Sequence, residues 1–318
     1  MAQSRETLIA QLCDSWLAVV QQPGGVIAIG PAAEAFRLTR NGINFHELDY
    51  AEIQASCVGL MRVLLLKGLS AVIDPDHQLF WAWIGELLLS SYGVYFTQQE
   101  SEIRELFDAC IRASLTGSQA APPTQAEWEE QQRIAELTDF NTRQLGRHAH
   151  LILASLCLPF LEATVKKVCA AYVDYAGNVK VAFSVPRPGG ARRNYNPLDP
   201  RNNKCSSLRD LLHLLLDSVA DADLQERLRE VRRHLQTLDN SVDPFDLIYS
   251  WRNQSLHGQA SFPTIGGTVL NLSILIALNQ LRSQYEKLRD RAWQKVQFDA
   301  TTYSRTRMRL PSSYYPPF

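Results

Sequence analysis

The stretch RQLGRHAHLILASLCLPFLEATVKKVCAAY, residues 143–172, is apolar over most of its length and predicts one long helix. Pro159 lies inside this stretch and is expected to kink the helix. The apolar run LILASLCLPFL is too short to span a bilayer as a helix. Apolar residues recur at helical spacing along much of the chain, so the sequence predicts an all-α fold.

The segment after this helix predicts a small β-hairpin. VDYAGNVKVAFSV, residues 173–185, alternates in character on both sides of AGN, which is typical of two strands joined by a turn. The next segment, PRPGGARRNYNPLDPRNNKC, residues 186–205, reads as a basic loop. Against one acid, Asp199, it carries the basic residues Arg187, Arg192, Arg193, Arg201 and Lys204.

Further helices are predicted on either side, and they suggest two helical domains and a tail. Their expected ranges are 5–22, 50–71, 77–91, 98–114, from 125 onward, 208–219, 223–238, from Asp243 or Pro244 to near 252, and 268–296. GSQAAPPTQ, residues 117–125, has the composition of a linker. We therefore expect an N-terminal helical domain over 1–140, a second helical domain over 141–296 with an insertion near 173–206, and a flexible Arg-, Tyr- and Pro-rich tail over 297–318.

The overall composition bounds the class of protein. The 318 residues are 46% hydrophobic and carry a formal net charge of −1, which gives no global attraction to nucleic acid or to a membrane. The 32 basic residues are 25 Arg and 7 Lys. Arginine is the better residue for bidentate phosphate contacts, although a genomic composition bias would give the same excess.

The six cysteines do not predict a metal site. None forms a CxxC pair, and no Cys/His cluster has the spacing of zinc ligands, so neither metal nor cofactor is expected. Most lie in apolar helical segments, which is typical of free thiols in a reducing cytoplasm. The start, MAQSRETLIAQ, has no basic stretch followed by an apolar one, so no signal peptide is predicted.

One short stretch carries the candidate chemistry. SWRNQSLHGQ, residues 250–259, places Asn253 directly after Arg252 and Gly258 directly after His257, with a predicted helix on each side. Arg followed by His at a similar spacing also occurs at Arg40 and His46, so the spacing alone decides nothing.

This combination resembles the RNxxxH motif of the HEPN superfamily, a group of all-α domains that includes many metal-independent ribonucleases. The first long helix of such domains has an acidic residue in an apolar run with a basic residue after it, and Glu162 and Lys166 occupy those places. The resemblance covers about residues 142–296. It implies a HEPN-like helical bundle with the hairpin as an insertion, and an endoribonuclease of toxin–antitoxin pairs or of phage or CRISPR defence.

The resemblance gives these residues roles that suit RNA chemistry. RNA supplies its own nucleophile, the 2′-OH, so the enzyme needs a group that moves protons near neutral pH and a fixed positive charge on the phosphate. His257 and Arg252 would supply these, Asn253 would position Arg252 or the RNA, and the product would end in a 2′,3′-cyclic phosphate. The basic loop is expected to bind the RNA backbone. The family pairs two such motifs in one cleft, so we expect a homodimer, with an antitoxin or defence-complex partner possible.

Other readings of the same residues stay open. An Arg or a His at a helix end can simply cap carbonyl groups. Related domains can lose catalysis and keep RNA or nucleotide binding, and a purely structural, protein-binding helical domain is the third alternative. Glu162 can form an ordinary i,i+4 contact with Lys166, or face Arg252 and support it. Arg40 and His46 are preceded by a single helix-length segment, so they are not expected to be catalytic.

Overall fold

The computed structural model describes residues 4–22, 26–27, 34–65, 75–89, 95–116, 125–126, 129, 133, 146, 148–256, 262–306 and 313–315. The fold is mainly helical, as predicted. The α-helices are α1 Arg5–Val20, α3 Tyr50–Leu64, α4 Pro75–Leu89, α5 Ser101–Leu115, α8 Ala149–Val168, α9 Leu208–Leu214, α10 Ala222–Gln236, α11 Pro244–Leu256, α12 Phe262–Gln280 and α13 Tyr285–Thr306. Short 3-10 turns include η2 Phe45–Glu47, η4 Gln98–Glu100 and η7 Arg282–Gln284, and a π-helical turn, Leu215–Val219, extends α9.

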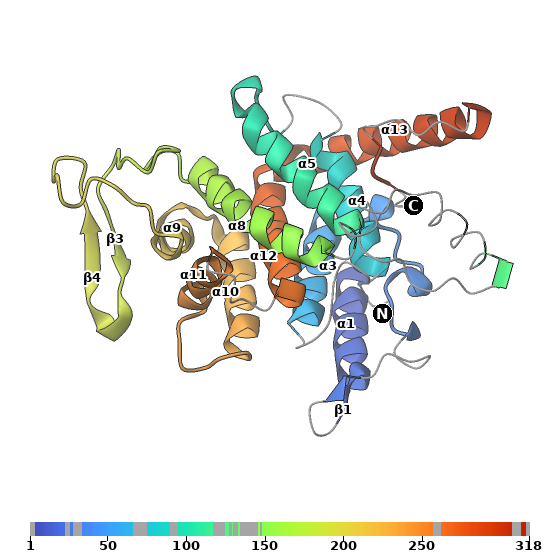
Figure 1. Cartoon of the computed structure of the whole chain (residues 1–318), viewed down its shortest axis with the longest axis horizontal. Coiled ribbons are helices and arrows are strands. Elements are labelled where there is room, and N and C mark those ends of the chain that lie inside the picture. The colour runs from blue at the N-terminus through green and yellow to red at the C-terminus, as the bar shows by residue number, and fades with distance from the viewer. Residues whose placement is uncertain are drawn as a thin grey trace.

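The centre of the molecule is α12, which packs against α8, α3, α10 and α11 (Figure 1). Nearly every residue from 265 to 281 is buried. A helix that is apolar on all sides is stable in water only when other elements surround it. Helices from both sides of residue 140 provide this cover and share one hydrophobic core. The predicted boundary itself lies among residues 134–145, outside the described residues, and the two-domain division stays a prediction.

The helix predicted from the opening stretch is α8, and it is continuous through Pro159. It packs against α12 and α5. At its crossing with α12, a Cβ added to Gly266 would lie 2.9 Å from the backbone nitrogen of Ala154. The absence of a side chain at Gly266 therefore lets the two helices approach closely, which fixes the position of the α8 face that carries Glu162.

The predicted hairpin forms ten residues further along the chain than the alternation indicated. β3 Phe183–Pro186 pairs antiparallel with β4 Arg192–Tyr195, around a turn in which Gly189 and Gly190 have positive φ. AGN forms a tight turn that Asp174 closes by accepting bonds from Asn178, but only the isolated bridge Val173–Val179 flanks it. β4 thus lies within the segment predicted as a loop. A second short pair is formed by β1 Gln21–Gln22 and β2 Val26–Ile27.

The C-terminal part of the chain differs most from its prediction. The single helix expected over 268–296 is two helices, α12 and α13, which meet at an angle of 65°. α13 continues to Thr306, and Ser313 and Tyr314 are buried against α4 and α13, so 297–306 and 313–315 are not a flexible tail. Among the described residues no single helix is both long and apolar enough to cross a membrane; by length and composition alone, the bent α12–α13 pair could.

Candidate functional site

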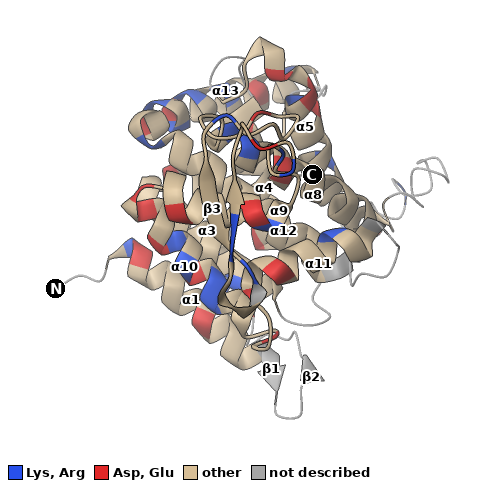
Figure 2. Ribbon diagram, turned by 90° about the vertical axis from the view of Figure 1, so that its left-hand side faces the viewer, with Lys and Arg blue, Asp and Glu red and all other residues tan. Residues whose placement is uncertain are grey.

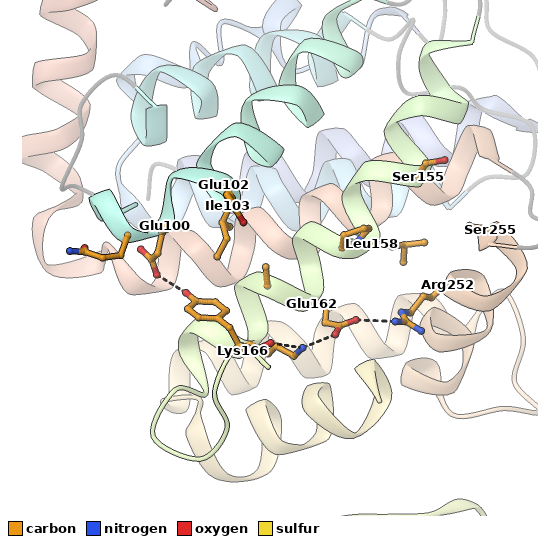
Figure 3. Close-up of a pocket in the computed structure, with 13 residues that line it drawn as sticks. Glu100, Glu102, Ile103, Ser155, Leu158, Glu162, Lys166, Arg252 and Ser255 are labelled. Carbon is orange, nitrogen blue, oxygen red and sulfur yellow. Dashed lines mark hydrogen bonds and ion pairs between the residues drawn. The ribbon is translucent and has the colours of Figure 1, made fainter. Parts of the chain in front are cut away.

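A pocket of about 520 Å³ lies between η4, the start of α5, the outer face of α8 and the end of α11 (Figure 3). Ile103, Leu158, Pro159 and Ala163 form its apolar wall. Its polar lining includes Glu100, Glu102, Ser155, Glu162, Lys166, Tyr175, Arg252 and Ser255. An apolar wall with a few convergent polar groups, at this volume, is typical of a small-molecule or nucleotide-sized site.

Arg252 and Glu162 meet at one end of this pocket. The Arg252 guanidinium lies 3.3 Å from Glu162 Oε2, and the Lys166 ammonium lies 2.8 Å from Glu162 Oε1. Lys166 also donates to the backbone carbonyl of Tyr175 at 3.1 Å. Both sequence-based alternatives for Glu162 therefore hold at once, since it pairs with Lys166 along α8 and with Arg252 across to α11. The carboxylate holds two cations whose side chains keep 31% and 11% of their surface exposed.

The start of α11 is fixed as the sequence predicted. Pro244 is the first helical residue, and Asp243 accepts a hydrogen bond of 2.8 Å from the Phe245 backbone N–H. Asp243 also pairs with Arg232 at 2.5 Å and with His213 at 3.5 Å. Burial alone would raise the pKa of Asp243, but these bonds outweigh it and lower the pKa to about 2. The Asp243 carboxylate thus holds the N-terminal end of α11, the helix whose last two turns carry Arg252.

The other end of the pocket is built by Glu100 and Tyr175. Tyr175 donates its hydroxyl to Glu100 Oε1 and Lys167 donates to Oε2, both at 2.5 Å. Burial alone would raise the pKa of Glu100, but these bonds and one from the Thr97 backbone lower the pKa to about 2. Burial and the Glu100 charge raise the pKa of Tyr175. Glu100 is thus a fixed anion, and this end of the pocket offers apolar and acidic surface.

The structure brings together only part of the predicted site. Arg252, Glu162 and Lys166 line the pocket, whereas Asn253, the next residue on α11, is half-buried and is not part of its lining. His257 lies outside the described residues. Ser255 does line the pocket, and its buried hydroxyl has no hydrogen-bond partner among the described residues.

Sequence reasoning did not find Ser255, Glu100 or Tyr175. Glu100 and Tyr175 lie 62 residues before and 13 residues after Glu162 in the chain. No motif links them, because only the packing of η4 and α5 against α8 brings them to one pocket.

The second Arg–His pair is separate from this pocket. Arg40 is exposed and lies 3.5 Å from Glu34. His46 stacks on Trp293 with ring centroids 3.8 Å apart, and burial lowers its pKa. The two residues therefore have separate local partners, and the expectation that they are not catalytic stays a prediction.

The basic residues of the predicted RNA-binding loop fall into two groups (Figure 2 shows the β3–β4 hairpin toward the viewer). Arg192 bonds to Ser184 on the opposite strand at 2.9 and 2.8 Å. Arg193 is half-buried, 3.5 Å from Asp210 and 4.8 Å above the Tyr195 ring. The remaining three, Arg187, Arg201 and Lys204, are exposed, and their side chains have no hydrogen-bond or ion-pair partner among the described residues.

The exposed group gives a direct test of RNA binding by the hairpin. Replacing Arg187 and Arg201 together by Glu is expected to weaken binding of single-stranded RNA and to flatten its salt dependence, by about 0.7 in log–log slope for each phosphate that the protein no longer neutralises. Filter binding between 50 and 300 mM salt measures this. The control is Lys287→Glu with Arg291→Glu, two exposed residues of α13 that give the same change in charge. Equal slopes for the two variants would show that the hairpin does not contact RNA.

Metal ligands and reactive cysteines were also sought in the part of the chain that the structure describes. No group of three or more His, Cys, Asp or Glu residues there could hold a metal ion. The six cysteines are free and buried, and burial raises the pKa of the thiols of Cys57, Cys110, Cys157, Cys169 and Cys205. None of them lines the pocket, so a reactive thiolate is not part of this candidate site.

Comparison of the chain with protein-family models, with curated proteins and with solved structures finds no match.

Proposed function

We propose that the protein is a metal-independent endoribonuclease of the HEPN type, working as a homodimer. The observation that carries the proposal is the ion pair of 3.3 Å between Arg252 and Glu162 at the wall of a nucleotide-sized pocket. An acidic residue of the first long helix and the Arg of the RNxxxH stretch are the two features on which the resemblance rests. They come from α8 and α11, 90 residues apart in sequence, and they share one pocket.

The proposed reaction uses the RNA's own hydroxyl. The 2′-OH attacks the adjacent phosphorus, the bond to the 5′ oxygen of the next nucleotide breaks, and the products carry a 2′,3′-cyclic phosphate and a 5′-hydroxyl. His257 would take the proton from the 2′-OH or give one to the leaving oxygen. Arg252, held in place by Glu162 and still partly exposed, would donate to the phosphoryl oxygens as negative charge increases on them.

A homodimer would double this small set of groups, because a two-fold axis near α11 brings two copies together. Little apolar surface is left along α11 for such an interface, because its apolar residues mostly pack inside the chain. Ile248 is fully buried, and Leu247 and Trp251 are partly buried. The proposed interface therefore depends on the polar rim of the pocket more than on an apolar patch. A toxin or phage-defence setting in the cytoplasm, with a neutralising partner, belongs to the same proposal.

The charge of the pocket weighs against catalysis there, and the second candidate is a non-catalytic RNA- or nucleotide-binding module that binds through residues outside the pocket, such as the exposed Arg187 and Arg201. Three carboxylates, Glu100, Glu102 and Glu162, line the pocket against two cations, Lys166 and Arg252. The two cations already share Glu162. A polyanion gains less from cations that a carboxylate already neutralises than from free ones. Binding of RNA without cleavage by the intact protein would select this candidate.

The direct test is cleavage without metal. Purified protein is expected to cut single-stranded RNA in excess EDTA, because the proposed groups need no divalent cation to generate the nucleophile. The products are separated on gels and their ends are identified by mass spectrometry as cyclic phosphates. Activity that disappears in EDTA and returns with magnesium or manganese would contradict the proposed mechanism.

A further inference from the structure

The segment Ser313–Tyr315 packs against α4, α5 and α13, on a different set of residues from the pocket, and the surface that it covers is called the groove below. Its anchor is Glu86 of α4, a carboxylate with no exposed surface. Glu86 Oε1 accepts the backbone N–H of Tyr314 at 2.5 Å and that of Tyr315 at 3.1 Å. Glu86 Oε2 pairs with Lys295 at 2.9 Å. One buried carboxylate therefore binds two successive backbone amides of the segment.

Each of the three side chains has its own partner in the groove. Ser313 donates to Asp299 at 2.7 Å, and Tyr314 donates to Asp108 at 2.5 Å beneath the Arg112 guanidinium. The Tyr314 ring fills a slot left by Gly85, where an added Cβ would lie 2.9 Å from its Cγ.

Tyr315 enters an aromatic cluster beside that slot. Its hydroxyl lies 3.4 Å from His46 Nδ1, and its ring meets Trp83 edge to face at 5.6 Å. Main-chain bonds for affinity and a separate contact for each side chain are how proteins recognise short extended peptides.

The groove can be filled by the chain's own end. Six residues, 307–312, connect Thr306 to Ser313, and six extended residues span about 20 Å. The return along α13 from Thr306 to the level of Asp299 is about 10 Å at 1.5 Å per residue. The connection formed by residues 307–312 is therefore long enough for the segment to reach the groove. It is also short enough to give the segment a high effective concentration there.

We propose that this groove is a binding site for an extended Ser-Tyr-Tyr peptide and that the chain's own C-terminal segment occupies it reversibly. The segment belongs to no helix or strand, and side-chain contacts and the two amide bonds to Glu86 hold it in place, with Tyr314 packed into the core. Short segments outside helices and strands open at a lower free energy than the core does. An empty groove would leave Glu86 paired with Lys295 alone, and a buried carboxylate with unused acceptor capacity is costly. The site therefore favours replacement of the segment by a second peptide of the same chemistry over a vacant state. This inference does not depend on ribonuclease activity.

The test uses the full chain and the labelled peptide LPSSYYPPF, which has the sequence of residues 310–318. In the Tyr314→Ala variant the internal segment competes less well, so fluorescence anisotropy is expected to show peptide binding at least tenfold tighter than to the wild type. The same peptide with alanine at the Tyr314 position should not bind. The matched control is Tyr303→Ala, an exposed tyrosine of α13, which should bind as the wild type does.

Two results would overturn the proposal. One is a folded Tyr314→Ala protein that does not bind the peptide, or that binds the alanine peptide equally well. The other comes from hydrogen exchange on the wild type, which needs no variant. The amides of Tyr314 and Tyr315 are expected to exchange faster than the core amides of α4, because the segment opens without global unfolding. Equal protection would make the segment a permanent part of the core.

Discussion

Replacing Arg252 or His257 by alanine is expected to reduce the rate of RNA cleavage about a hundredfold to a thousandfold, with the fold intact. A general acid or base contributes about 10²–10⁴ to a rate, and one donor to developing charge about 10²–10³. Arg252 is 31% exposed, and Glu162 is its one ion-pair partner among the described residues. Loss of a partly exposed ion pair costs about 1 kcal/mol or less of stability. Single-turnover cleavage assays and thermal melts separate the two effects.

The second Arg–His pair provides the matched control. Arg40→Ala and His46→Ala remove the same residue types at nearly the same spacing, yet neither residue lines the pocket. Both variants are expected to cleave RNA within about twofold of the wild type. If His46→Ala loses as much activity as His257→Ala, the motif has been assigned to the wrong place.

Mixing the two inactive variants tests the homodimer. A heterodimer of Arg252→Ala and His257→Ala chains keeps one Arg and one His, on opposite subunits. Partial recovery of cleavage on mixing would indicate a shared cleft, and dilution should then lower the specific activity as dimers dissociate. A monomer with full specific activity would contradict the two-fold arrangement and leave the motif as a site within one chain.

The parts of the fold that could be predicted are those that depend on residues close together in the sequence. Apolar spacing located α1, α4, α5, α10 and α11 to within about four residues at each end, and α3 and α8 to within seven. Asp243 followed by Pro244 placed the start of α11, because a side-chain cap and a residue without an N–H both suit the first helical turn. The Glu162–Arg252 contact was one of two alternatives, and sequence alone could not show that both contacts of Glu162 form.

The parts that were missed depend on tertiary packing. The break between α12 and α13 carries neither Pro nor Gly in residues 281–284. Instead, the largely buried α12 ends where the chain leaves the core, and the amphipathic α13 turns along the surface. The tail was predicted to be flexible because of its composition, yet Tyr314 is 4% exposed. Its place in the structure depends on contacts with Glu86 and Asp108, more than 200 residues earlier.

The position of the β3–β4 hairpin also could not be predicted from local sequence. The alternation placed the turn at AGN, and PGG was assigned to the loop that follows. The AGN turn is closed by the Asp174 side chain, and the Val173–Val179 bridge is flanked by backbone bonds from Asp174 to Asn178 and from Lys180 to Tyr172. The pairing goes no further, because residues 171–172 belong to a turn and the chain bends at 180–181. The two positive-φ glycines at 189 and 190 then allow the longer pair, in which Tyr195 is buried beside Asp210.

The largest loss of stability is expected from Gly266→Leu. The first atom of any side chain there would lie 2.9 Å from the Ala154 nitrogen and 3.2 Å from its Cα. These are backbone atoms in the second turn of α8, so the two helices must separate or one must shift along the other. Gly266→Ala is expected to lower the free energy of unfolding by about 1–3 kcal/mol, the usual cost of overpacking, and Gly266→Leu by more. Urea denaturation measures both.

The control is Ala300→Leu, which enlarges an exposed residue of α13 and should change stability by about 0.5 kcal/mol or less. The same displacement would act on the candidate site, because α8 carries Glu162 and α12 begins just beyond the RNxxxH stretch. A Gly266→Ala protein that remains folded should therefore cleave RNA more slowly than the wild type, whereas Ala300→Leu should not. If Gly266→Leu proves as stable as the wild type, α8 and α12 do not cross as closely as described, and the distance between Glu162 and Arg252 no longer follows from their packing.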